Sequence, residues 1–250
     1  VGLSDPDGLE RFIETRRDEG IFLSVLGFGT GNYNDSIMQL LAQAGNGNAA
    51  YIDSYSEARK VLVEEMGGTL MTIAKDVKIQ VEFNPQTVSE YRLIGYETRA
   101  LAREDFNNDA VDAGDIGAGH TVTAIYEITP VGARGSVDPL RYGDEAVAAP
   151  NNGSDELGFL KLRYKAPDGD VSELIETPIS FDGDGAMTSD DLDFATAVAA
   201  FGQKLKGSTH LRAMDWSEIR ALAASAVGDD PTGRRAEFVR LVDIAASLTN

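Results

Sequence analysis

A change in the spacing of apolar residues near residue 70 constrains the fold of this chain more than any other feature of its sequence. From residue 75 the sequence reads KDVKIQVEFNP, in which apolar and polar side chains alternate strictly: Val77, Ile79, Val81 and Phe83 against Lys78, Gln80 and Glu82. Such alternation predicts a strand with one buried face and one face in solvent. Further strands are predicted within residues 88–99, 120–130, 157–167 and 170–180. Together they predict an antiparallel, sandwich-like β region, and Lys161, Arg163 and Lys165 share the solvent face of one of its strands.

Before residue 70 the spacing is that of alternating helices and strands. Helices are predicted at 6–17, 34–44 and 54–66, and strands at 20–29 and 49–53. The helix ends carry typical capping residues: Asp5 with Pro6, then Asn34 or Asp35, Gly45, and Gly67 with Gly68. This order is typical of an α/β sheet whose parallel strands are buried on both faces. Because two strands cannot enclose a core, the segment is predicted to be part of a larger domain.

Helical spacing returns near residue 188 and continues to the end of the sequence. Three helix starts are predicted from capping patterns: Thr188 with Asp191, Asp215 with Glu218, and Asp230 with Pro231. We therefore predict an α+β chain with a partial α/β segment at 1–70, an antiparallel β region with long acidic loops at 71–182, and a helical region at 183–250.

The composition excludes several classes of function. With 22 basic and 41 acidic residues the net charge is −19, so nucleic acid and anionic membranes are predicted to be poor partners. The absence of cysteine excludes disulfides, thiolate metal sites and cysteine nucleophiles. No apolar run approaches the roughly 18 residues of a membrane span. The sequence begins VGLSDPDG, without a methionine, which favours a fragment or a processed product.

Three glycines follow the first apolar run: Gly27, Gly29 and Gly31. Strand, glycine loop, helix, strand and then an acid, Asp53, is the order of a dinucleotide-binding unit. However, Asn32 stands where that fingerprint requires a third glycine, and a cap at Asn34 or Asp35 comes too late to meet a phosphate. We interpret the loop as a strand-to-helix turn and Asp53 as an acid that caps the next turn. A nucleotide-dependent enzyme is the minor alternative.

Two acidic loops match part of a calcium-binding pattern. The calcium candidates are Asp105, Asn107 and Asp109 in the first loop and Asp182 and Asp184 in the second. An EF-hand loop also needs a glycine at its sixth position and a glutamate at its twelfth. Ala110 replaces the glycine in the first loop, and the second has Ala186 at its fifth position and Asp193 at its twelfth. Both patterns are incomplete, so solvated acidic turns are the preferred interpretation.

The sequence supplies no recognisable catalytic constellation. Its two histidines, His120 and His210, lie far apart and form no metal-ligand pair. A nucleophile-elbow motif does not occur. We therefore assign no catalytic residue and no cofactor-binding residue, and no metal ligand beyond the calcium candidates. The chain is predicted not to be an enzyme.

Residues 20–62, GIFLSVLGFGTGNYNDSIMQLLAQAGNGNAAYIDSYSEARKVL, resemble the last third of a von Willebrand factor A domain. The stretches KDVKIQVEFNPQTVSEYRLIGYETR and DAGDIGAGHTVTAIYEITP are similar to the C-terminal part of bacterial von Willebrand A-domain proteins, often labelled calcium-activated chloride channel homologues. The resemblance implies that the first segment is the rear of a three-layer, Rossmann-like α/β domain.

An A domain of this family binds a divalent ion through a D-x-S-x-S loop, a threonine and a T-D-G turn. None of these motifs occurs in the sequence, which implies a chain truncated after the metal-site motifs, with Mg or Ca expected only in the intact A domain. The resemblance implies a non-enzymatic interaction or adhesion-type module with a protein partner. Association with the missing N-terminal part, or with a second copy, is also expected. The alternative is a calcium-stabilised structural domain. An extracytoplasmic or cell-envelope location is predicted, with the cytoplasm as the alternative.

Overall fold

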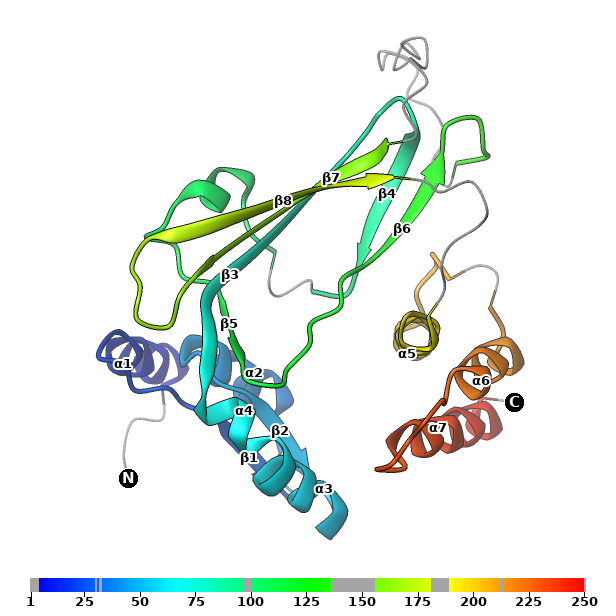
Figure 1. Cartoon of the computed structure of the whole chain (residues 1–250). Coiled ribbons are helices and arrows are strands. Elements are labelled where there is room, and N and C mark those ends of the chain that lie inside the picture. The colour runs from blue at the N-terminus through cyan, green and yellow to red at the C-terminus, as the bar shows by residue number, and fades with distance from the viewer. Residues whose placement is uncertain are drawn as a thin grey trace. The chain divides into compact units, whose positions relative to one another are not determined.

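The computed structural model describes residues 5–29, 31, 33–96, 100–135, 156–180, 189–211 and 214–249. These residues form both helices and sheets (Figure 1), so the predicted α+β class is confirmed. The chain divides into two compact units, neither of which is continuous in sequence. The first comprises Val1–Val81, Leu101–Thr121 and Leu160–Thr177, and the second comprises Glu82–Ala100, Val122–Phe159 and Pro178–Asn250.

The first unit begins with an α/β segment. Its elements are α1 (Pro6–Asp18), β1 (Val25–Phe28), α2 (Asp35–Ala44) and β2 (Ala49–Ile52). The predicted caps Asp5 and Asn34 are confirmed, because each side chain accepts a hydrogen bond from a backbone amide in the first turn of its helix. Strands β1 and β2 are parallel, with Val25 opposite Ala49. The prediction that β1 is buried on both faces is wrong, since Phe28 is 64% exposed.

Three short helical segments follow β2. They are α3 (Tyr55–Arg59), the π-helical η1 (Lys60–Glu64) and α4 (Met66–Leu70). Asp53 does not cap this region, because Ser54 is the N-cap and its hydroxyl accepts an amide hydrogen of the first turn. The predicted helix end at Gly67 and Gly68 is also wrong, since both lie inside α4. Gly68 instead permits close contact, because a Cβ added to it would lie 2.8 Å from the Ala118 carbonyl oxygen.

The long strand β3 (Thr72–Phe83) carries a bulge in the first unit. It pairs antiparallel with β5 (Gly114–Gly117), which the sequence had placed in a loop. The register shifts between Ala74 and Val77, and Asp76 within this interval has a positive φ of 50°. An extra residue in a strand redirects the side chains around it. The bulge therefore sets which groups of β3 face the segment that contains β5.

At two adjacent positions, burial along β3 differs from the prediction of strict alternation. Lys78 is 5% exposed although it was assigned to solvent, and Ile79 is 39% exposed although it was assigned to the core. The 3-10 helix η2 (Arg103–Asn107) causes this difference, because the Lys78 ammonium group donates to its backbone. Phe106, in the same helix, is 3% exposed. Alternation correctly predicts the strand and the exposure of Glu82, but not the burial of Lys78 or the exposure of Ile79.

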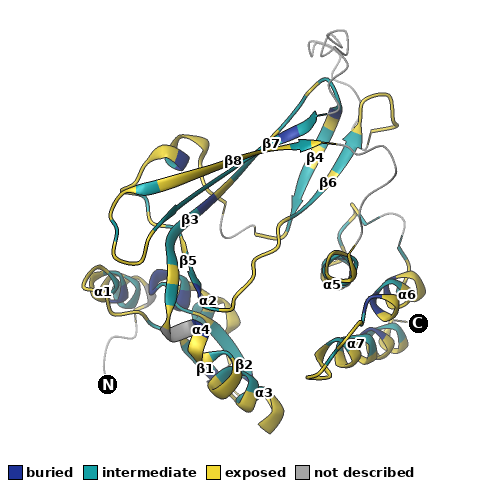
Figure 2. Ribbon diagram, viewed as in Figure 1, coloured by how far each residue is buried: buried dark blue, intermediate teal, exposed yellow. Residues whose placement is uncertain are grey.

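The sheet that contains β3 has the strand order β5-β3-β7-β8. Its remaining strands are β7 (Glu156–Lys165) and β8 (Ser172–Ser180). The predicted solvent face of β7 is largely covered, since the side chains of Arg163 and Lys165 are 19% and 12% exposed. Strand β8 is an edge strand that is exposed along most of its length (Figure 2). Pro178 in β8 lacks an amide hydrogen, which suits an edge position.

A separate two-stranded sheet lies in the second unit. Its strands β4 (Val88–Ile94) and β6 (Ile125–Pro130) are antiparallel and shorter than predicted. The ring of Phe83 lies 4.6 Å from that of Tyr91 and 5.3 Å from that of Tyr126, measured between centroids. These aromatic contacts pack Phe83, the last residue of β3, against the sheet.

Three helices complete the second unit. They are α5 (Asp190–Leu205), α6 (Trp216–Ser225) and α7 (Arg234–Leu248), as helical spacing predicted. Their core contains Ala200, Ile219 and Val242, with exposures of 5%, 0% and 0%. The rings of Phe201 and Phe238 contact each other edge to face, with centroids 5.2 Å apart, and both rings pack against this core. Each helix contributes one apolar stripe to it.

The starts of these helices agree only in part with the predicted caps. The capping box of Asp215 and Glu218 is confirmed, because each side chain accepts the backbone amide hydrogen of the other residue. Thr188 lies outside the described residues, and the N-cap of α5 is Ser189. Helix α7 begins later than Asp230 and Pro231 predict, after a left-handed Gly233.

Candidate functional site

The first acidic loop is the centre of a polar network in the first unit. It contains the calcium candidates Asp105, Asn107 and Asp109. Lys78 of β3 donates from Nζ to the carbonyl oxygens of Asp105, at 3.2 Å, and Asn108, at 2.5 Å. A buried ammonium group needs such acceptors because it has lost its hydration. Lys78 therefore fastens the end of η2 to β3.

Two cationic side chains of β7 bind the same loop. Arg163 donates from Nη1 to Oδ1 of Asn107 at 2.8 Å, and Lys165 donates from Nζ to the carbonyl oxygen of Asp109 at 2.8 Å. The Asp109 carboxylate accepts the Ser172 hydroxyl hydrogen at 2.6 Å. This bond, together with the Ser172 amide and the charges of Arg163 and Lys165, holds the pKa of Asp109 below its usual range.

Protein donors thus occupy oxygens of all three calcium candidates in this loop. A calcium ion bound there would compete with two ammonium groups and one guanidinium group. Within the described ranges, no three or more His, Asp or Glu side chains are arranged to hold a metal ion. The other candidates, Asp182 and Asp184, lie outside those ranges. Calcium binding by the first loop stays a prediction.

Three carboxylates gather where the loop meets the bulge of β3: Asp76, Asp112 and Asp115. The Asp76 carboxylate accepts hydrogen bonds from Lys165 Nζ, at 2.6 Å, and from the amide of Ala113, at 3.0 Å. The amide of Asp76 donates in turn to Asp115 Oδ1 at 3.1 Å. The second oxygen of Asp115, Oδ2, is buried and has no hydrogen-bond partner among the described residues.

Asp112 connects the loop to the α/β segment. Its carboxylate accepts hydrogen bonds from Arg17 Nη1 of α1, at 3.0 Å, and from Asn46 Nδ2 after α2, at 3.3 Å. Arg17 Nη1 also donates to the carbonyl oxygen of Ala44 at 3.4 Å, at the end of α2. These contacts hold together α1, α2 and the 101–117 segment, our name for the η2–β5 region of the first unit.

The electrostatics of the cluster favour proton binding. Burial raises the pKa of Asp115, and the charges of Asp76 and Asp112 raise it further, against an opposing amide bond and the charge of Lys75. Burial also raises the pKa of Asp112, although Arg17 opposes this shift. Chemically, the arrangement can store a proton next to a strand bulge.

Two tyrosine side chains lie beside the glycines that end β1. Tyr51 donates from its hydroxyl to the carbonyl oxygen of Gly29 at 2.9 Å, and its ring centroid lies 4.6 Å from that of Tyr33. A Cβ added to Gly27 would lie 2.5 Å from the Tyr33 ring. Asn32 lies outside the described residues. The geometry therefore favours the strand-to-helix turn, since the Tyr33 ring occupies the space beside Gly27.

The two histidines belong to different compact units. His120 packs over α4, where a Cβ added to Gly68 would lie 2.6 Å from its Nε2. His210 follows α5, and its amide donates to the hydroxyl of Ser208 at 3.3 Å. Both observations describe structural contacts at chain turns.

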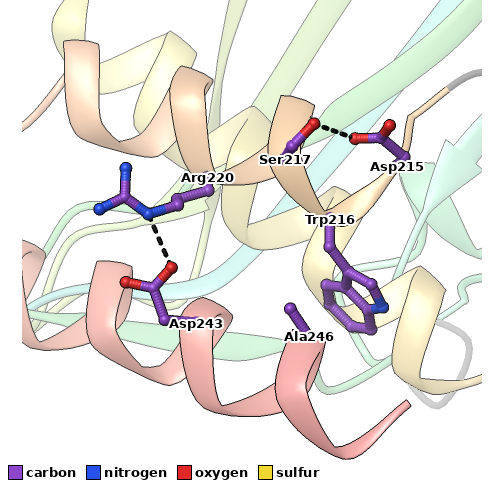
Figure 3. Close-up of a pocket in the computed structure, with 6 residues that line it drawn as sticks. All are labelled: Asp215, Trp216, Ser217, Arg220, Asp243 and Ala246. Atoms are coloured by element: carbon purple, nitrogen blue, oxygen red, sulfur yellow. Dashed lines mark hydrogen bonds and ion pairs between the residues drawn. The ribbon is translucent and has the colours of Figure 1, made fainter. Parts of the chain in front are cut away.

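The second unit contains a surface pocket of about 370 Å³ between α6 and α7 (Figure 3). Its lining residues are Asp215, Trp216, Ser217, Arg220, Asp243 and Ala246. Arg220 Nε donates to Asp243 Oδ1 at 2.6 Å, and the Ser217 hydroxyl donates to Asp215 Oδ1 at 2.7 Å. Asp215 also caps α6. These polar groups thus stabilise the helices that carry them.

Sequence reasoning missed the residues of β3 and β7 that build the polar network. Lys78 and Lys165 were assigned to solvent, and Asp76 showed no distinguishing pattern. Their partners lie 27 to 89 positions away along the chain. The one available signal was the general attraction between lysine side chains and an acidic loop. That signal is weak in a chain with 41 acidic residues.

Comparisons with known proteins place the chain in a family. The family described as "Uncharacterized protein YfbK, C-terminal" matches residues 68–248. "Uncharacterized protein YfbK" of Escherichia coli (strain K12) is 48% identical over 250 residues, which are 100% of this chain and 43% of that protein. The chain therefore spans less than half the length of this curated relative. Among solved structures, "von Willebrand factor type A from Catenulispora acidiphila" matches 96% of this chain and 54% of its own, with 14% identity and a TM-score of 0.39.

In the part of the chain that the structure describes, no helix is both long enough and apolar enough to cross a membrane. The family match covers the strands β3 to β8 and the helices α5 to α7, and so it includes the whole polar network except its contacts to α1 and α2. Since the match extends over more than half of the sequence, the chain belongs to the YfbK C-terminal family.

Proposed function

We propose that this chain is a non-enzymatic protein-interaction module of a von Willebrand A-type protein. The resemblance of residues 20–62 to the last strands of an A domain supports this assignment. In this proposal the divalent-metal site, with Mg or Ca, belongs to a part of the full-length protein outside this chain. A hard cation with an open coordination position binds an oxygen ligand, so a carboxylate of the partner protein completes the site.

The observation that carries the proposal is the small parallel sheet of the first unit. Parallel sheets normally have both faces covered. Among the described residues, β1 and β2 pair only with each other. Phe28 in β1 and Tyr55 after β2 are 64% and 86% exposed. Unpaired strand edges beside exposed aromatic rings form a surface suited to addition of another strand.

The partner of this edge is a strand from the remaining part of the full-length protein, with a second copy of the chain as the alternative. The length of the E. coli relative, of which this chain spans 43%, supports the first choice. The net charge of −19 disfavours nucleic acid as a partner. An extracytoplasmic or cell-envelope location fits an adhesion-type module and is part of the proposal.

Hydrogen exchange on the full-length protein and on this chain alone tests the strand addition. We expect amides of Val25–Phe28 or Ala49–Ile52 that exchange rapidly in the chain alone to become protected in the full-length protein. Amides around Ile219 in α6 serve as the control, since they should exchange equally in both. Equal exchange of β1 and β2 in both proteins, with both monomeric in sedimentation velocity, would contradict the proposal.

Calorimetric titration with Mg²⁺ and Ca²⁺ tests the location of the metal. Binding by the full-length protein, without binding by this chain alone, is the expected result. Calcium binding by the chain alone would support the alternative of a calcium-stabilised domain. A full-length protein that binds neither ion would contradict the metal-dependent part of the proposal.

A further inference from the structure

Asp115 differs from its two neighbouring carboxylates in how its charge is compensated. Asp76 accepts a hydrogen bond from the Lys165 ammonium group, and Asp112 accepts one from the Arg17 guanidinium group. From the described part of the chain, Asp115 accepts only the amide hydrogen of Asp76, at Oδ1. Its Oδ2 is buried, with no partner among the described residues. A buried oxygen with a negative charge and no donor is costly, so this atom is the natural proton acceptor of the cluster.

The charged groups of the cluster come from β3, β7, α1 and the 101–117 segment. Lys75 and Asp76 of β3 and Asp112 of the 101–117 segment act on Asp115 itself. Arg17 of α1 acts on Asp112, and Asp109 and Asp170 act, with Asp76, on Lys165 of β7. Lys165 and Arg17 are hydrogen-bonded to the other two carboxylates. The charge of Lys75 lowers the pKa of Asp115, but its effect is the smallest of those that act on this carboxyl. Asp76 and Asp112 are therefore each paired with a cationic side chain, whereas Asp115 is hydrogen-bonded to a backbone amide.

We propose that Asp115 is a protonation switch that sets how tightly the 101–117 segment is fastened to the bulge of β3. When Asp115 binds a proton, the buried negative charge disappears and its repulsion of Asp76 and Asp112 ends. The Asp76 carboxylate then holds Lys165 and the amide of Ala113 without that repulsion. Mild acidification tightens this attachment, and an alkaline shift loosens it. Because Asp112 binds Arg17, the effect extends to α1 and α2.

The direction of the pH effect follows from proton linkage. Burial raises the pKa of Asp115 in the folded chain, so folding favours its protonated form. Stability from this group grows as pH falls through the raised pKa and is complete below the ordinary value of 3.8. It is lost as pH rises through the raised pKa. Asp109, whose pKa is lowered, contributes in the opposite sense and loses its stabilising effect at low pH.

Carboxyl-carbon NMR on the intact chain tests the switch directly and needs no variant. We expect the Asp115 carboxyl to titrate above 3.8, the ordinary value, and the Ala113 and Asp76 amide signals to shift over the same pH interval. Each unit of upward shift corresponds to about a tenfold tighter proton affinity than in the unfolded chain. An Asp115 carboxyl that titrates at 3.8 or below would overturn the proposal.

The variant Asp115→Asn tests whether this proton controls the attachment. The amide side chain is neutral at every pH, so protection of the Ala113 and Asp76 amides from hydrogen exchange should lose its dependence on mild acidification. Asp53→Asn is the matched control, since it removes the same charge from an exposed position of the same unit. The control should keep the wild-type pH dependence. Equal pH dependence in both variants would count against the switch.

Discussion

The 101–117 segment of the first unit and the three helices of the second unit are held by different interactions. The helices bury apolar side chains, and Ile219 and Val242 have no exposed surface. The segment is held by hydrogen bonds from cationic side chains, among them Lys78 and Lys165. Apolar packing is roughly additive in buried area, whereas a polar network needs each donor matched to an acceptor. The two regions should therefore respond differently to substitution and to pH.

The largest expected effect is on the helical core. Ile219→Ala leaves a cavity at a fully buried position and should lower the free energy of unfolding by about 2–5 kcal/mol. Urea unfolding followed by the fluorescence of Trp216, which packs against this core, measures the change. Ile244→Ala is the control, because Ile244 is 55% exposed and should change stability by less than about 0.5 kcal/mol. Similar losses in both variants would show that the helices are not stabilised by this core.

Lys78→Met tests the polar attachment of the 101–117 segment. The thioether fills similar space but leaves the carbonyl groups of Asp105 and Asn108 without their donor, so a loss of about 1–3 kcal/mol is expected. Circular dichroism during thermal unfolding and proteolysis within the segment measure it. Lys161→Met is the control, because the Lys161 side chain is partly exposed and its Nζ lies 3.8 Å from Glu176 Oε1, in a looser ion pair on the same strand as Lys165. A Lys78→Met variant as stable as this control would contradict the anchoring role.

Substitution of two adjacent glycines in α4 distinguishes the effect of helix propensity from the effect of close tertiary contact. Gly67→Ala should stabilise by about 0.5–1 kcal/mol, because no atom of the described residues lies within 4 Å of the added Cβ and alanine favours a helix. Gly68→Ala should destabilise by about 1–3 kcal/mol, because its Cβ would lie 2.8 Å from the Ala118 carbonyl oxygen. Denaturant unfolding compares the pair. Stabilisation by both substitutions would show that α4 does not pack closely on the turn after β5.

The smallest expected effect is at the start of α6. Asp215→Ala removes a confirmed capping box and should lower the melting temperature slightly more than Asp229→Ala, which alters an exposed acid nearby. Bonds from the Ser217 hydroxyl and the Glu218 amide lower the pKa of Asp215. Its contribution is therefore present above 3.8 and declines as pH falls through the lowered pKa. The difference between the two variants should accordingly shrink in strong acid.

Local signals predicted the elements better than the site. The caps at Asp5, Asn34 and Asp215 were found because a capping side chain acts on its own first turn. The burial of Lys78 was missed because it depends on η2, which begins 25 residues further along the chain (103 − 78 = 25). Asp115 stood out only as one acid of the first acidic loop, and its unpartnered oxygen was missed because β5 and the bulge of β3 pair only in the folded chain.

By itself the sequence determined the α+β class, the positions of most helices and strands, and the parallel pairing that β1 and β2 adopt. These properties follow from the periodicity of apolar residues and from capping, which act over a few residues. Tertiary structure alone set which face of β3 is covered and which carboxylate lacks a donor. Burial and charge compensation depend on groups that only the folded chain brings together, so no local pattern reports them.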